Sequence, residues 1–382
     1  MPVNREALGK KLGHLRQHLG LSIDELSRVT SIDEQRLYLI EAGELECSGD
    51  ELLILADHYK VNFVSLLRKE IDLVDGMDAF YRSSGSGLSK DDRASIQEFL
   101  FLCENEKFLL EDIGRNNIVE FSPKIHGDMY KIHGVQIAQQ LREVLGFKEN
   151  QVPADIYYEF RRLGFHIFRR KLDDSNISGI FIKHVTAGKC ILVNFYEDIY
   201  RQRFTVAHEV CHALIDNKYS YNISKDNDSK KSLIEIRANN FASEFLLPSA
   251  LLKEFASSLA VGNDEQIIGI ANRLQVNPIS LAIALSEKCG ISAELKEYIG
   301  SLKINRTVKN DPELSGAYSA RYLSAKENVL QRGLSSFYVN LCIDAYEQGI
   351  ISLNRLSYVL LCSRDELFEI AEMFGRNINV KL

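Results

Sequence analysis

The stretch from Phe204 to Ile215 constrains this chain more than any other part of its sequence. It places His208 and His212 four residues apart, with Glu209 directly after the first histidine. Its flanks are apolar and no glycine or proline interrupts it, which predicts a buried helix. Positions i and i+4 lie on the same face of a helix. Both imidazoles can therefore reach one metal ion, with Glu209 beside them.

A catalytic metal needs a further protein ligand. The sequence H-E-x-x-H is typical of zinc peptidases, in which the glutamate is the general base and zinc has three protein ligands and a water. Downstream, Glu235 opens an amphipathic stretch that Pro248 ends, which predicts a second helix. Glu235 is the expected third metal ligand, and Glu244 is its rival. Asn239, one turn after Glu235, is expected to hold a ligand histidine by its other ring nitrogen.

These two predicted helices resemble the ImmA/IrrE family of metallopeptidases. The likeness rests on H-E-x-x-H from His208, on Glu235-x-x-Ala-Asn239-x-Phe-Ala and on the Leu-Leu-Pro that ends at Pro248. It covers roughly residues 130–255. The resemblance implies a gluzincin-like zinc protease that cleaves or disables a repressor-type protein. It also implies a Zn²⁺ cofactor on His208, His212 and Glu235, with Glu209 as the catalytic residue.

Residues 1–69 are expected to form a domain of five short helices. A stripe of leucines from Leu8 to Leu19 predicts the first helix. Ser22 and Glu25 have the spacing of a capping box, and Gly43 is a plausible helix stop. The arrangement resembles the Xre-type helix-turn-helix domain of phage repressors, with residues 33–41 as the presumed recognition helix.

The resemblance implies contacts with duplex DNA through Ser22, Gln35, Arg36 and Tyr38. The charge of residues 1–68 argues against DNA binding, because this region has eight basic and eleven acidic residues. Affinity for DNA rests mainly on the neutralisation of phosphates. A domain of this fold could instead dock a protein or form a homodimer, and the sequence leaves both roles open.

Residues 70–125 are expected to link the two recognised parts. Ser83–Gly87 reads as a flexible break. A long helix is predicted to start near Ser89, with Ile96 and Phe99 on its apolar face. This helix is either a structural strut against the peptidase domain or a dimerisation helix.

Residues 126–258 are expected to form a zincin-like peptidase domain with a small β-sheet. Three β-rich runs precede the metal-binding stretch, at Phe165–Phe168, Gly179–Ile182 and Cys190–Val193. We expect the strand at Cys190–Asn194 to be the edge strand, alongside which an extended substrate could pair.

Two features near the metal-binding stretch stay open. Residues 217–232 are polar, which predicts a loop that acts as a lid over the cleft. The group that stabilises the oxyanion during amide hydrolysis could be Tyr219, Tyr221 or His184, and the sequence does not choose among them.

Residues 259–382 are expected to form a helical C-terminal regulatory domain. The patterns at Glu265–Leu281 and Leu353–Phe374 have a helix-turn-helix rhythm, which generic packing of helical hairpins also produces. This region either shapes the substrate cleft or senses a signal.

Composition limits the class of protein. The chain is 45% hydrophobic and 26% charged, and no apolar run approaches the roughly 20 residues of a membrane span. Its seven cysteines are scattered and never form C-x-x-C, which indicates buried thiols in a reducing cytoplasm. The expected fold class is α+β and predominantly helical.

The sequence therefore predicts a cytosolic zinc-dependent peptidase that cleaves a repressor-type protein and is coupled to a helix-turn-helix module. The alternative is a DNA-binding transcriptional regulator or antitoxin-like protein whose peptidase domain is a non-catalytic sensor. Neither alternative involves a membrane.

Overall fold

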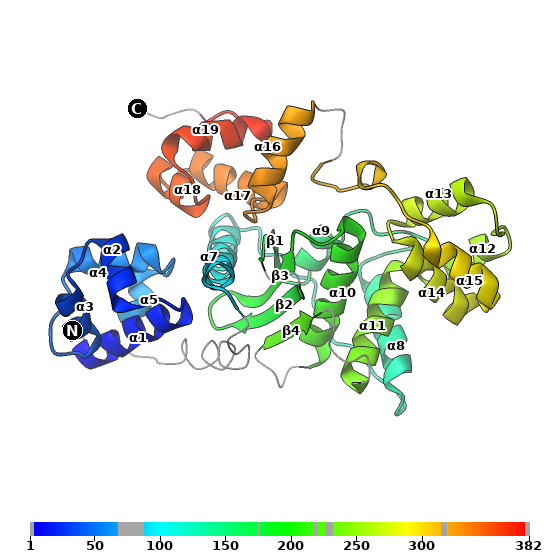
Figure 1. Cartoon of the computed structure of the whole chain (residues 1–382), viewed down its shortest axis with the longest axis horizontal. Helices are drawn as coiled ribbons and strands as arrows, with labels where there is room; N and C mark the ends of the chain where they lie inside the picture. The colour runs from blue at the N-terminus through cyan, green and yellow to red at the C-terminus, as the bar shows by residue number, and fades with distance from the viewer. Residues whose placement is uncertain are drawn as a thin grey trace. The chain divides into compact units, whose positions relative to one another are not determined.

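The computed structural model of the chain is mostly helical with one small sheet, which confirms the predicted α+β class (Figure 1). It describes residues 4–67, 88–173, 176–216, 221–225, 232–314 and 319–378, with the backbone alone for 222–225. The chain divides into two compact units. Unit 1 comprises residues 1–105, 172–174 and 184–187, and unit 2 comprises the rest. The division into four domains at residues 69, 125 and 258 stays a prediction.

Unit 1 contains the five predicted N-terminal helices. They are α1 (Arg5–His18), α2 (Ile23–Thr30), α3 (Glu34–Glu41), α4 (Gly49–His58) and α5 (Phe63–Leu67). The capping box is present, because Ser22 Oγ accepts from the Glu25 N–H and the Glu25 carboxylate accepts from the Ser22 N–H. Gly43 follows the end of α3 with a φ of 76°, a left-handed conformation that suits glycine. Leu8, Leu12 and Leu19 are buried in one apolar core.

The long helix α7 (Lys90–Asp112) follows, and the Asp92 N–H bonds to Ser89 Oγ at its start. Ile96 and Phe99 are fully buried, as their positions on the apolar face predict. The expected flexible break at Ser83–Gly87 lies outside the described residues.

Unit 2 holds the remaining helices. They are α8 (Tyr130–Val144), α9 (Ile156–Arg161), α10 (Ile199–Ile215), α11 (Leu233–Leu246), α12 (Ser249–Ala256), α13 (Asp264–Leu274), α14 (Pro278–Cys289), α15 (Ala293–Ser301), the 3₁₀ helix η2 (Arg306–Val308), α16 (Ala320–Leu330), α17 (Ser336–Glu347), α18 (Leu353–Val359) and α19 (Arg364–Met373). The stretch predicted to bind metal lies in α10, and Glu235 lies in α11. Residues on α8, α10, α11 and α14 share one apolar core.

The sheet corrects two of our expectations. Its strands are β1 (Phe165–Arg170), β2 (Ile177–His184), β3 (Gly188–Asn194) and β4 (Tyr221–Lys225), in the order β1-β3-β2-β4. The run at Cys190–Asn194 is therefore an inner strand, since β3 pairs in parallel with β1 and has β2 as its other neighbour. The edge next to β2 is β4, which pairs with it in antiparallel fashion.

β4 lies inside the segment that we expected to be a lid loop. Residues 221–225 form a strand because their backbone groups complete the ladder of β2, and the polar residues on either side of this short run in the sequence hid it from a pattern based on hydrophobicity. The other residues of the expected lid, apart from Ser232, lie outside the described residues.

A close approach between α8 and α11 positions the helix that carries Glu235. The two helices lie side by side (Figure 1), and Gly134 of α8 faces the backbone of α11. A Cβ atom at Gly134 would come within 2.3 Å of the Arg237 carbonyl oxygen and 2.8 Å of the Phe241 nitrogen. Only glycine allows the two helices this separation.

In the described part of the chain, no single helix is both long and apolar enough to cross a membrane. One sharply bent pair, α13 and α14 with 89° between them, reaches the required length and composition together.

We predict that Gly134→Ala destabilises the chain by about 1–3 kcal/mol, because the added methyl group forces α8 away from α11. Gly269→Ala is the matched control, since Gly269 also lies within a helix but has no atom within 4 Å of an added Cβ. The control should unfold at the same temperature as the parent chain or slightly higher. Thermal unfolding followed by circular dichroism measures both. Equal melting temperatures for the two variants would contradict the close approach.

A candidate metal centre

Helix α10 begins five residues before the stretch that we took as the metal helix. Asp198 is its N-cap and accepts a hydrogen bond from the Tyr200 N–H at 3.0 Å. Asn277 and Lys309 also bond to the Asp198 carboxylate. Asn277 and Lys309 belong to the helical region that follows the peptidase motifs in the sequence. Contacts with that region therefore hold the start of α10 in place.

His208, His212 and Glu235 bring three ligand atoms together. The two histidine Nε2 atoms lie 3.0 Å apart, and they lie 3.1 Å and 3.3 Å from the two oxygens of Glu235. A tetrahedral zinc with bonds of about 2.0–2.2 Å needs ligand atoms about 3.3–3.5 Å apart. The triangle is slightly tighter than this, so a small outward movement of each side chain would fit the ion.

Each histidine is held by its other ring nitrogen. His208 Nδ1 lies 3.0 Å from Asn239 Oδ1, in the contact that we predicted for this asparagine. His212 Nδ1 lies 2.9 Å from a carboxylate oxygen of Asp216, which sequence reasoning missed. Arg237 donates to the other oxygen of Asp216. The signal for Asp216 was its i+4 spacing from His212, although it is the capping residue just after α10 ends at Ile215.

This arrangement favours a cation. An oxygen acceptor at each Nδ1 places the ring proton there, which leaves each Nε2 with a bare lone pair. The two lone pairs and the Glu235 carboxylate then converge on one point, where only a positive charge satisfies all three. Zn²⁺ prefers this nitrogen and oxygen donor set.

The pKa values of the site agree with a need for positive charge. Burial would lower the pKa of His212, but bonds to Asp216 and Glu235 outweigh it and raise this pKa to about 9. Burial would raise the pKa of Glu235, but bonds to His208 and His212 hold it well below its usual range. A proton on His212 therefore stabilises the site where no metal ion does so.

Glu209 is fully buried beside β2. A Cβ atom at Gly179 would lie 2.5 Å from Thr205 Cγ2 and 3.3 Å from Glu209 Cγ. Gly179 therefore leaves the space that the Glu209 side chain and the methyl group of Thr205 occupy. β2 crosses α10 at the residue that we expect to act as general base.

The candidates for stabilising the oxyanion can be judged by the face of the sheet on which each side chain lies. Side chains point alternately to the two faces of a sheet along a strand. Gly179 lies on the face that contacts α10, so Ile182 and His184 lie on the opposite face. Tyr221 pairs with Ile182 and therefore lies on that opposite face as well. The His184 ring accepts from the Ala187 N–H and lies 3.7 Å from Glu104. Tyr219 lies outside the described residues.

Glu244, the rival third ligand, is engaged elsewhere. Its carboxylate is buried, lies 2.8 Å from the Lys288 ammonium and accepts from Gln139 and Ser249. Within the described residues, the potential metal ligands that lie together are His208, His212 and Glu235 alone. The structure therefore favours Glu235 over Glu244.

The four candidate DNA contacts differ in availability. Ser22 Oγ serves as the N-cap of α2. Arg36 forms a two-pronged ion pair with Glu51, in which Nη2 lies 2.9 Å from Oε2. Gln35 and Tyr38 are exposed on α3, Tyr38 by 60%. The two exposed side chains are therefore better placed to reach DNA than Ser22 or Arg36.

Comparison with known families matches both motif-bearing regions. Residues 160–286 match the family model of the IrrE N-terminal-like domain, Peptidase_M78. This range includes β1, α10 and α11, and thus the whole metal centre. Residues 7–65 match the model of a helix-turn-helix domain. No curated protein matches the chain.

We predict that Asp216→Ala weakens zinc binding by about 10- to 100-fold, because His212 loses the partner that fixes its ring. Asp50→Ala, which removes the same charge from an exposed position on α4, should leave zinc binding unchanged. Competition for zinc with a fluorescent chelator measures both affinities. Equal affinities would show that Asp216 does not support the ligand.

Proposed function

Because the chain carries an IrrE N-terminal-like domain of the M78 peptidases and a helix-turn-helix domain, we propose that it is a zinc-dependent peptidase that cleaves a regulatory protein. The observation that carries this proposal is the triangle of ligand atoms on His208, His212 and Glu235 beside the buried Glu209. The M78 family model covers the same residues. We assign the metal to these three side chains and the general base to Glu209.

The chemistry is amide hydrolysis. His208, His212 and Glu235 would hold the zinc ion, which would supply a water of lowered pKa and polarise the substrate carbonyl. Glu209 accepts the proton of the attacking water and then donates it to the nitrogen of the leaving amine. Its carboxylate is buried, which keeps bulk water from competing for that proton. Asn239 and Asp216 keep the ligand histidines oriented throughout.

The edge strand β4 offers a way to bind the substrate. An extended segment of substrate could add to the free edge of β4 by main-chain hydrogen bonds. Ser224 of β4 pairs with Gly179, which lies against Glu209. A substrate strand along β4 would thus pass at the level of the general base.

The presence of a helix-turn-helix domain supports the proposal that the substrate is a repressor-type protein. Such a domain could bring the peptidase to DNA or to a DNA-bound protein, and we propose that this happens in the cytoplasm. The alternative role is that of a regulator or antitoxin-like protein whose peptidase domain senses a signal without turnover. The two roles differ in one measurable respect, the cleavage of a protein partner.

We predict that Glu209→Gln keeps zinc but cleaves a repressor-type protein that the parent chain cuts at least about 100-fold more slowly than the parent chain does. Glutamine has nearly the same shape but cannot accept the proton of water. Glu265→Gln, at an exposed position on α13, is the matched control and should cleave normally. Mass spectrometry of the fragments gives the rate and the cleavage site. A partner that binds the parent chain but is never cut would favour the sensor role instead.

We further predict that Tyr38→Ala and Gln35→Ala each weaken DNA binding by about 1–3 kcal/mol, as the loss of a base contact does. The probe is a duplex that the parent chain selects from a random-sequence pool. Tyr196→Ala is the control, because Tyr196 is exposed to the same degree at 61% but lies after β3. Fluorescence anisotropy measures all three. If the parent chain selects no duplex, the domain docks a protein rather than DNA.

A further inference from the structure

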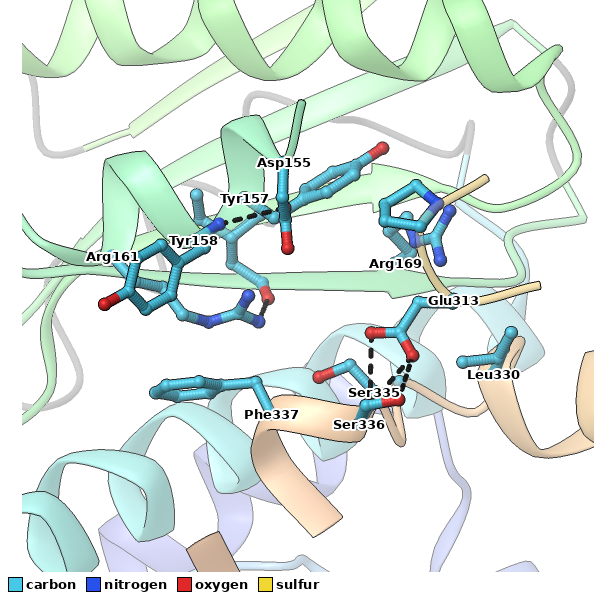
Figure 2. Close-up of a pocket in the computed structure, with 13 residues that line it drawn as sticks. Asp155, Tyr157, Tyr158, Arg161, Arg169, Glu313, Leu330, Ser335, Ser336 and Phe337 are labelled. Atoms are coloured by element: carbon cyan, nitrogen blue, oxygen red, sulfur yellow. Dashed lines mark hydrogen bonds between the residues drawn. The ribbon is translucent and has the colours of Figure 1, made fainter. Parts of the chain in front are cut away.

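A cavity of about 130 Å³ lies within unit 2 (Figure 2), and none of the residues that line it belongs to the candidate metal centre. One wall comes from α9 and β1, and the other from the linker before α16 and the start of α17. Asp155 and Arg161 lie on the first wall, and Glu313, Ser336 and Phe337 lie on the facing wall (Figure 2). The cavity therefore lies between the peptidase domain and the C-terminal helices.

Arg161 provides a buried cation with unused donors. Its side chain is 9% exposed, and its guanidinium lies over the ring of Phe337 at 4.6 Å. One nitrogen donates to the Ile167 carbonyl oxygen, while Nε lies 3.7 Å from Glu106 and has no hydrogen-bond partner within the described residues. A guanidinium carries five donors, so most of them remain available to an oxyanion.

The start of α17 lies on the same cavity. Ser335 caps this 12-residue helix by accepting from the Tyr338 N–H, and the Glu313 carboxylate accepts from the Ser336 N–H at 3.0 Å. Ser335, Ser336 and Phe337 all line the cavity. The Glu313 carboxylate thus already occupies the positive end of this helix, and it lies on the same cavity as the Arg161 guanidinium.

Two carboxylates lie on the same cavity. Asp155 uses one oxygen to cap α9, where it accepts from the Tyr158 N–H at 3.1 Å. Its other oxygen makes no hydrogen bond within the described residues. Glu313 adds a second negative charge from the opposite wall. The cavity therefore presents positive and negative groups together, which suits neither a simple anion nor a simple cation.

We propose that this cavity binds a small zwitterion, an α-amino acid. Its carboxylate is bound by the Arg161 guanidinium, and its ammonium group is bound by Asp155 and Glu313. The volume limits the ligand to a short side chain, which Ile167 and Leu330 contact as buried apolar walls. Tyr158 is 51% exposed and marks the opening to solvent. This site is separate from the proposed peptidase activity and does not depend on it.

The test is a binding measurement on the full chain by isothermal titration calorimetry and thermal unfolding. L-alanine should bind and raise the melting temperature, because a ligand that binds only the folded chain stabilises it. L-alaninamide lacks the carboxylate, and N-acetyl-L-alanine lacks the ammonium group. Neither should bind measurably at millimolar concentration. Binding of inorganic phosphate or acetate as strong as that of L-alanine would overturn the proposal, as would the absence of any response to L-alanine, L-serine and glycine.

Two variants, each a change of one charged side chain, locate the site. Asp155→Asn keeps the helix cap, since asparagine caps as well as aspartate, but loses the charge that binds the ammonium group. Arg161→Lys keeps the charge beside Glu106 but loses the planar pair of donors. Each should weaken L-alanine binding by about tenfold or more. Asp33→Asn, the same change at the N-cap of α3, is the control and should bind as the parent chain does. Parent-like binding by Asp155→Asn and Arg161→Lys would place the ligand elsewhere and overturn the proposal.

Discussion

The convergence of three bare ligand atoms is the constraint on which the rest of the peptidase domain depends. Two Nε2 lone pairs and a carboxylate come within 3.3 Å of each other, an arrangement that repels itself unless a positive charge lies at its centre. Hydrogen bonds at the Nδ1 atoms keep the two rings in this arrangement, from Asn239 to His208 and from Asp216 to His212. Gly134 adds to this by letting α8 support α11 at close range. These contacts prepare the site before a metal ion arrives.

The sequence predicted that His208, His212, Glu235 and Asn239 lie together, because the geometry of this group is mostly local. An i, i+4 pair on one helix fixes the relation between His208 and His212 whatever the tertiary structure is. Glu235 and Asn239 have the same spacing on a second helix, so a single helix–helix contact brings all four together. The capping box at Ser22 and the stop at Gly43 are local in the same way, and both are present.

Features that depend on tertiary contacts were beyond the sequence. The strand order is one such feature. Nothing in the run at Cys190–Asn194 shows that it forms an inner strand of a sheet whose edge strands are β1 and β4. β4 is another, because its five residues form a strand only where β2 is present to pair with them. The pairing of Arg36 with Glu51, 15 residues away, occupies a side chain that we had assigned to DNA. The contacts of Asp216 with His212 and with Arg237 of α11 depend on how α10 and α11 pack.

Zinc binding by His208, His212 and Glu235 is tested by the metal content of the purified chain and of its Glu235→Ala variant, from inductively coupled plasma mass spectrometry. We expect about one zinc ion per chain, and loss of most of it in the variant, because three protein ligands define such a site. Circular dichroism would show that the variant is folded. A folded parent chain that takes up no transition metal after zinc is supplied, or a variant that retains a full complement, would contradict this expectation.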